Sequence, residues 1–433
     1  MTGLLHVAVR SAWNRRGTLA LVVLSIALAT ALLLGLERLR TDIRSSFTHA
    51  VSGTDLIVGA RTGPVQLMLY SVFRVGGATN NIGMDSVRAV AAHRAVSWVV
   101  PLSLGDSHRG HPVLGTTPEY FTRFAYGDRE PLVVALGRPF SGTLDGLFDA
   151  VLGAEVADAL GYGLGQRITL THGLGAAAGV GGALAAEHAD KPFTVVGVLA
   201  RTGTPVDRTV HVSLQAIEAI HLDWVGGAPL PASAGVKIAP EHARKFDLEP
   251  KQVTAALVGL KNRVAVFNVQ RFVAAYEPEP LLAVLPGVAL DELWTAVGLG
   301  ERALMAMSGL VALVSLASLV AVVLAGLNER RRELAVLRAV GAGPRHVLAL
   351  LAAEGALVTG LGAILGAAAA ALAVVLAGPW VQQRFGIALQ ATAPTAEQWG
   401  LFAAVLLAGI LASLVPGLRA YRLSLADGLS PKV

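Results

Sequence analysis

The sequence contains no cysteine, which excludes a disulfide framework, a thiolate metal site and a cysteine nucleophile. Charged residues make up only 15% of it, against about a quarter in an ordinary soluble domain. Three catalytic motifs are also missing, namely the phosphate-binding loop G-x-x-x-x-G-K-[ST], H-E-x-x-H and G-x-S-x-G. Nothing local in the sequence therefore indicates that the chain hydrolyses ATP, peptides or esters by itself.

Apolar residues, in contrast, make up 54% of the chain. They gather in four runs that are long enough to cross a bilayer, at 19–36, 303–327, 347–377 and 399–415. Trp380 and Trp399 border the last two runs, where interfacial anchors are expected. The first run also resembles a signal peptide, with small residues near its middle. We interpret it as a span because it is longer than a usual signal core and continues into an arginine-bearing helix.

Charge placement predicts the orientation of the spans. The loop between the second and third spans is rich in arginine, whereas the loop between the third and fourth spans has only Arg384. Because positive loops stay in the cytoplasm, both termini are expected inside and the long insert outside. Residues 41–300 hold 20 basic and 23 acidic residues, a net charge of −3, although the whole chain carries +5. A slightly acidic globular part argues against nucleic-acid binding.

These observations predict an α-helical membrane protein of four spans, with a mixed α+β periplasmic domain inserted between the first and second spans. Strands are expected at 167–171, 193–199 and 209–213, and helices at 151–160 and 215–221. The low-complexity stretches 173–186 and 226–233 are predicted to be a loop and a linker. The predicted order is the N-terminus with span one (1–40), the periplasmic domain and start of a stalk (41–300), span two (301–327), a cytoplasmic coupling loop (328–346), span three (347–378), a short periplasmic loop (379–397), span four (398–418) and a cytoplasmic tail (419–433).

The arginine loop carries a family resemblance. The sequence NERRRELAVLRAVGAGPRHV at 328–347 resembles the signature of the ABC permeases that include the macrolide exporter, the lipoprotein-releasing permeases and the cell-division permease. VLGAEVADALGYGLGQRITL at 151–170 is similar to the external motif of that family, and PGLRAYRLSLADGL at 416–429 is similar to its closing pattern. The chain is thus identified as a member of this type VII ABC permease superfamily.

The resemblance implies a non-catalytic subunit of the bacterial inner membrane that transmits ATP-driven movement to a periplasmic domain, for export or extraction of a substrate. ATP and Mg²⁺ would bind to a separate ATPase subunit, and this chain would bind no cofactor. Further expected partners are a second permease subunit, most simply an identical copy, a periplasmic binding or adaptor protein, and membrane lipid. Docking on the ATPase is expected to involve Arg330, Arg331, Arg332, Glu333, Leu334, Leu337, Arg338 and Gly341.

Two other functions stay open. The same movement could regulate a periplasmic enzyme or partner without transport. A zinc-like metal uptake or handling role is the second, because the external domain is rich in histidine, the commonest metal ligand. The candidate ligands around the low-complexity loop are His108, His111, His172, His188 and Asp190.

Two further sets of residues are singled out by their setting. Glu354 and the glycines that follow it interrupt an apolar span, where small residues allow close helix approach, so we predict helix packing by Glu354, Gly355, Gly362 and Gly366. The stretch 55–82 departs from the family pattern, and its large apolar residues form a candidate cargo surface, namely Met68, Tyr70 and Phe73.

Overall fold

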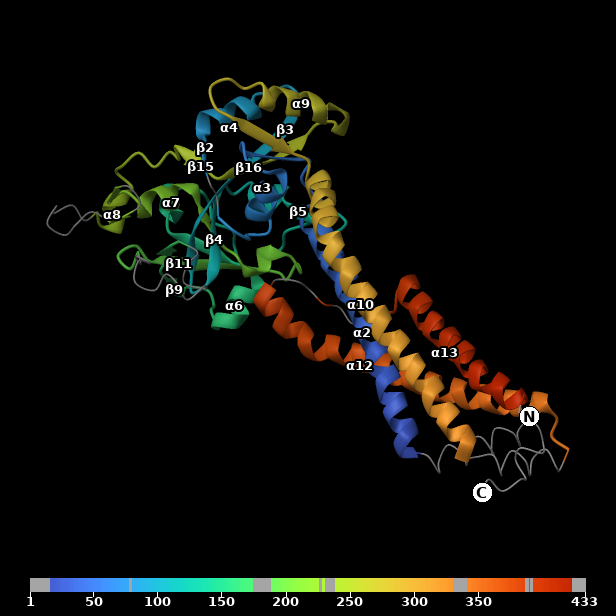
Figure 1. The fold of residues 1–433 in the computed structure, drawn as a ribbon. Helices are drawn as coiled ribbons and strands as arrows, with labels where there is room; N and C mark the ends of the chain where they lie inside the picture. The colour runs from blue at the N-terminus through green and yellow to red at the C-terminus, as the bar shows by residue number, and fades with distance from the viewer. Residues whose placement is uncertain are drawn as a thin grey trace. The chain divides into compact units, whose positions relative to one another are not determined.

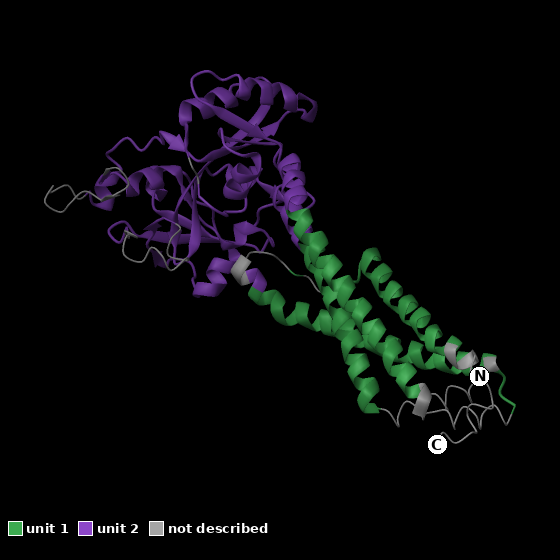
Figure 2. Ribbon diagram, in the orientation of Figure 1, with its two compact units in different colours: residues 1–42, 297–380, 389–433 green, residues 43–296, 381–388 purple. Residues whose placement is uncertain are grey.

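The structure is a computed structural model that describes residues 16–77, 80–173, 188–225, 228–229, 238–329, 341–385, 389 and 392–422 (Figure 1). It has two compact units (Figure 2), which we call the helical unit (1–42, 297–380 and 389–433) and the sheet unit (43–296 and 381–388). Most of the arginine loop, from Arg330 to Val340, lies outside the described residues, as do residues 174–187 of the low-complexity stretch.

Four long helices carry the four apolar runs. They are α2 (Arg16–Ala50), α10 (Pro286–Glu329), α12 (Pro344–Phe385) and α13 (Ala396–Arg422). Each contains a stretch that is long and apolar enough to cross a membrane, which confirms the four predicted spans. Helix α10 is continuous from the predicted stalk into the second span. Helix α13 continues through Pro416 to Arg422, past residue 418, the predicted end of span four.

The sheet unit is built on an eleven-stranded mixed sheet with the order β17-β1-β16-β3-β4-β12-β8-β11-β7, in which β10 also pairs with β3 and β9 with β11. The strands of this sheet are β1 (Leu56–Ala60), β3 (Val96–His108), β4 (His111–Thr116), β7 (Val134–Gly137), β8 (Asp149–Leu152), β9 (Arg167–Ile168), β10 (Thr171–His172), β11 (Phe193–Leu199), β12 (Val210–Ser213), β16 (Ala255–Leu260) and β17 (Leu281–Val284). Short two-stranded pairs are β2 (Ile82–Gly83) with β15 (Gln252–Val253), β5 (Ala125–Tyr126) with β6 (Glu130–Pro131), and β13 (Trp224–Val225) with β14 (Ala228–Pro229).

Short helices cover the sheet: α3 (Pro64–Ser71), α4 (Met84–Ala91), α5 (Tyr120–Arg123), α6 (Ala154–Leu160), α7 (Leu214–Ile220), α8 (Pro240–Ala243) and α9 (Val266–Ala274). One buried cluster joins α4 and α9 to the strands around β1, and a second joins α6 and α7 to the strands around β8. A third contains side chains of α3 and the first turns of α10. The mixed α+β class is confirmed.

The predicted local elements are largely correct. The strands predicted at 193–199 and 209–213 are β11 and β12, and the second predicted helix is α7. The predicted helix at 151–160 is wrong in its first residues, because Val151 and Leu152 belong to β8, which pairs with β11 and β12 before Gly153 begins the turn into α6. The strand predicted at 167–171 is divided between β9 and β10.

Candidate functional site at the end of the first span

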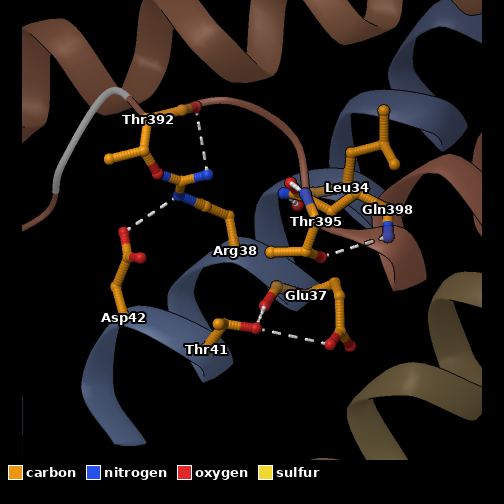
Figure 3. Close-up of polar contacts among 8 residues, drawn as sticks. All are labelled: Leu34, Glu37, Arg38, Thr41, Asp42, Thr392, Thr395 and Gln398. Atoms are coloured by element: carbon orange, nitrogen blue, oxygen red, sulfur yellow. Dashed lines mark hydrogen bonds and ion pairs between the residues drawn. The ribbon is translucent and has the colours of Figure 1, made fainter. Parts of the chain in front are cut away.

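A buried arginine lies just beyond the first apolar run. Arg38 on α2 is only 7% exposed. Its Nε donates to the Asp42 carboxylate at 3.1 Å, one helical turn further along. Its two terminal nitrogens donate to Thr392, one of them to the backbone oxygen at 3.3 Å and the other to the hydroxyl (Figure 3). The guanidinium thus fixes the segment before α13 to the end of the first span.

The start of α13 is capped on the same side. Thr395 and Gln398 form a reciprocal capping box, in which the Thr395 amide donates to the Gln398 side chain at 3.0 Å and the Gln398 amide donates to the Thr395 hydroxyl at 3.3 Å. The Gln398 side-chain amide also donates to the Leu34 backbone oxygen at 3.4 Å (Figure 3). The capping box therefore fixes where α13 begins, and the Gln398 side chain joins that helix to α2.

An ion pair connects α2 to α10 near Arg38. Arg40 pairs with Glu37 at 3.0 Å and with Glu301 of α10 at 3.3 Å. Deeper in the span, the hydroxyls of Ser25 and Ser315 lie 2.9 Å apart. We call Arg38, Arg40, Asp42, Glu301 and Thr392 the span-end cluster. Its charged groups link α2 to α10, and its hydrogen bonds to Thr392 link α2 to the segment that precedes α13.

A pocket of about 380 Å³ adjoins Arg38. Its walls come mainly from apolar side chains of α12 and α13, such as Val374, Trp399 and Phe402. Among the described residues that line it, Arg38 is the one ionisable group.

The span-end cluster was not predicted from the sequence. Arg38 and Arg40 follow the first span on the side predicted to be external, where the charge rule predicts few positive residues. The spacing of Arg38 and Asp42 is that of a helical ion pair, and Thr395-x-x-Gln398 is a capping signature. These two local signals could have been found, but the contact of Arg38 with Thr392 joins residues 354 positions apart.

Removing the Arg38 guanidinium should destabilise the helical unit. We expect Arg38→Met to cost about 3 kcal/mol, because it removes the buried ion pair with Asp42 together with both hydrogen bonds to Thr392. The measurement is thermal unfolding of the purified full chain in detergent. Arg302→Met, at an exposed position of α10, is the matched control and should leave unfolding unchanged. Equal melting of the two variants would contradict the assigned role of Arg38.

The glycines predicted for packing lie at helix contacts. A Cβ added to Gly366 would meet the Ala27 oxygen of α2 at 2.5 Å, and one added to Gly362 would meet Ile26 at 2.8 Å. Gly355 faces Ser413 of α13 in the same way, at 2.2 Å. Glu354 is buried, at 3% exposure. Helix α12 thus uses its glycines against two different neighbours.

The candidate cargo surface is a wrong prediction. Met68, Tyr70 and Phe73 are 0%, 5% and 7% exposed. Phe73 stacks on Phe47 with ring centroids 4.2 Å apart, and the Tyr70 hydroxyl donates to the Leu104 oxygen at 3.1 Å. These side chains are in the core of the sheet unit because helix α3 turns its apolar face onto β1 and β17.

The predicted metal ligands are only partly brought together. His172 and His188 lie within one cluster, where Asp106 and His221 join them. His108 is instead bonded to the Thr169 oxygen and the Tyr162 hydroxyl, and Asp190 pairs with Lys191. His111 lies on β4 outside the cluster. The predicted five-residue set is therefore wrong as a single site.

Of the predicted ATPase-docking residues, the structure describes only Gly341, which has a φ of 99°.

Comparison with known families decides the classification. Residues 17–242, 226 of the 433, match the MacB-like periplasmic core domain, and residues 305–425 match the FtsX-like permease C-terminal domain. The chain belongs to the MacB/FtsX superfamily of ABC permeases. This confirms the resemblance seen in the sequence, and with the four apolar helices it makes the permease a multi-pass membrane protein. Subunits of this family are transport components that are generally not catalytic themselves.

Two solved structures are similar to parts of the permease. One is the periplasmic region of MacB from Actinobacillus actinomycetemcomitans, with 11% identity and a TM-score of 0.34, covering 57% of the permease and 97% of that chain. The other is the extracellular domain of the noncanonical ABC-type transporter YknZ from Gram-positive bacteria, with 14% identity and a TM-score of 0.28, covering 47% and 89%. No curated protein matches the permease.

Proposed function

We propose that this permease couples ATP hydrolysis by a separate ATPase subunit to movement of its periplasmic domain, and thereby exports or extracts a substrate. In this proposal it works in the bacterial inner membrane as a dimer, with both termini in the cytoplasm. The ATPase docks on the arginine loop, residues 328–346. The sheet unit lies in the periplasm, where it handles the substrate or a partner protein.

The observation that carries the proposal is the length of two unbroken helices. Helix α2 has 35 residues and α10 has 44, which correspond to about 52 Å and about 66 Å at 1.5 Å per residue. A bilayer core needs about 30 Å. Each helix contributes residues to both units, so each can carry a displacement of its span directly into the periplasmic domain.

The contacts between the two helices support joint movement. Within the helical unit, Ser315 bonds Ser25 and Glu301 pairs with Arg40. Within the sheet unit, the Arg44 guanidinium lies 5.2 Å from the centre of the Trp294 ring, and Phe47 meets the same ring edge-on at 5.4 Å. Four side-chain contacts along the pair make independent sliding of α2 and α10 unfavourable.

The test is co-purification with the ATPase and measurement of ATP hydrolysis in the complex. We expect Leu334→Asp combined with Leu337→Asp to lower bound ATPase at least tenfold, because two leucines three residues apart would share one apolar face if the arginine loop forms a docking helix. Arg129→Asp, at an exposed position of the sheet unit, is the control and should bind normally. Full ATPase binding by the double variant would overturn the proposed docking site.

A further inference from the structure

Four potential metal ligands from four parts of the sheet unit converge on one point. Asp106 is on β3, His172 is opposite it on β10, His188 precedes β11, and His221 ends α7. Each residue offers one ligand atom, and all four atoms lie within 4.8 Å of one another. This convergence is created by the fold, since the ligands are spread over more than a hundred residues of sequence.

The distances resemble those of a tetrahedral site. His172 Nδ1 lies 3.0 Å from Asp106 Oδ1 and 3.2 Å from His221 Nε2, and the latter two atoms are 3.8 Å apart. Zinc binds nitrogen and oxygen ligands at about 2.0–2.1 Å in a tetrahedron, which places neighbouring ligands about 3.3 Å apart. The spacings among these three ligands bracket that value, and the ligand atom of His188 lies within 4.8 Å of each of them.

His221 is held in the tautomer that a metal requires. Its Nδ1 lies 2.8 Å from the Ile217 backbone oxygen, which can only accept a hydrogen bond. The ring therefore carries its proton on Nδ1 and has a lone pair on Nε2, the atom nearest to His172 and Asp106. A backbone carbonyl that fixes a histidine in this way is the usual outer shell of a metal site.

His188 presents a polar atom that the protein does not satisfy. The residue is 1% exposed, and its Nε2 is buried without a hydrogen-bond partner among the described residues. Buried polar atoms without partners are rare in proteins and need an explanation. A bound cation would explain the unsatisfied Nε2 of His188. The hydrogen bond between His172 and Asp106 does not explain it, because that bond does not involve His188.

The residues around the four ligands hold them in place, and two carboxylates compensate the charge of the neighbouring Lys191. Lys191 is fully buried and pairs with Asp223 at 2.7 Å and Asp190 at 3.2 Å. Because Lys191 follows His188 closely and Asp223 follows His221, this ion pair joins the two segments that carry those ligands. The Trp224 ring, 4.5 Å from the His188 ring and 5.3 Å from that of His221, covers one side.

We propose that Asp106, His172, His188 and His221 bind one zinc-type divalent cation. Three imidazoles and one carboxylate are a borderline-soft ligand set that suits Zn²⁺ and Co²⁺. With four protein ligands the site is closed, so the ion has a structural or regulatory role and not a hydrolytic one. The side chains of His172 and His221 are 40% and 25% exposed, which leaves the ion able to exchange. The inference stands independently of the proposed coupling to an ATPase.

The test is metal titration of the purified full chain after treatment with a chelator. We expect one Zn²⁺ per chain by calorimetry, and the visible bands of tetrahedral Co²⁺ when Co²⁺ is used as the probe. His188→Ala and His221→Ala should each weaken binding at least about 100-fold. His242→Ala, at an exposed position outside the cluster, should bind like the unmodified chain.

A second measurement separates loss of binding from loss of folding. Zn²⁺ should raise the melting temperature of the unmodified chain, and this rise should vanish in His172→Gln, a conservative change at the most exposed ligand, while the melting temperature without metal stays the same. No stoichiometric binding at micromolar Zn²⁺ would overturn the proposal. Equal affinity of His221→Ala and the unmodified chain would do so as well.

Discussion

Gly300→Pro should uncouple the periplasmic domain from the ATPase while leaving ATP hydrolysis in the complex nearly intact. Position 300 lies in α10 near the change from the sheet unit to the helical unit. Proline at this position removes the backbone N–H that donates to the oxygen four residues earlier, and its ring clashes with that oxygen. The cost is about 3 kcal/mol, and the helix is kinked or broken. A broken α10 can no longer transmit displacement of its span. We expect ATP-dependent movement of the periplasmic domain to fall at least tenfold.

Gly300→Ala is the matched control. No atom outside the helix backbone lies within 4 Å of a Cβ at this position, so alanine fits and should strengthen the helix by up to about 1 kcal/mol. Its ATP-dependent movement should equal that of the unmodified permease. If the proline variant retains full movement, α10 is not the transmitting element.

Gly366→Leu should prevent assembly of the helical unit. A Cβ at Gly366 already meets the Ala27 backbone oxygen at 2.5 Å and the Thr30 Cβ at 2.7 Å. A backbone oxygen cannot rotate out of the way as a flexible side chain can, so α12 must separate from α2. Overpacking of this kind costs about 3 kcal/mol or more. We expect the variant to be lost from the folded fraction in detergent, as judged by size-exclusion chromatography and thermal unfolding.

The same helix supplies the control for that experiment. Gly360 is six residues earlier on α12, and a Cβ added there meets nothing within 4 Å. Gly360→Leu changes hydrophobicity and helix propensity by the same amount but creates no clash, so it should purify and melt like the unmodified chain. If both leucine variants behave alike, the close approach of α12 to α2 at Gly366 is not required.

The four spans and the class of the external domain were predictable because they depend on local properties. Long apolar runs must lie in a membrane or a core, and strands such as Phe193–Leu199 are β-branched and bounded by turns. The packing glycines were also visible, since small residues in an apolar helix have few other roles. Which neighbour each glycine meets was not visible, because Gly355 and Gly362 are seven residues apart and so share nearly one face of the helix, differing mainly in position along its axis.

The parts that sequence reasoning missed are set by tertiary pairing. Asp106 and His172 meet because β10 adds to β3 in one particular register, and no spacing rule predicts this. His108 is a predicted ligand, but its two ring nitrogens are hydrogen-bonded to the Thr169 oxygen and the Tyr162 hydroxyl. The large apolar residues of α3 are predicted to form a cargo surface, yet their neighbours on β1 and β17 bury them. Hydrophobic character alone does not distinguish a binding surface from a core.

The most direct test of the coupling account is the distance between the periplasmic domains of a reconstituted complex of permease and ATPase. Because the chain has no cysteine, Asp128→Cys provides one labelling site per copy, at an exposed position of the sheet unit. Spin labels on the two copies should report a distance distribution that shifts on addition of ATP and Mg²⁺ and returns after hydrolysis. An unchanged distribution in a complex that hydrolyses ATP would contradict the account.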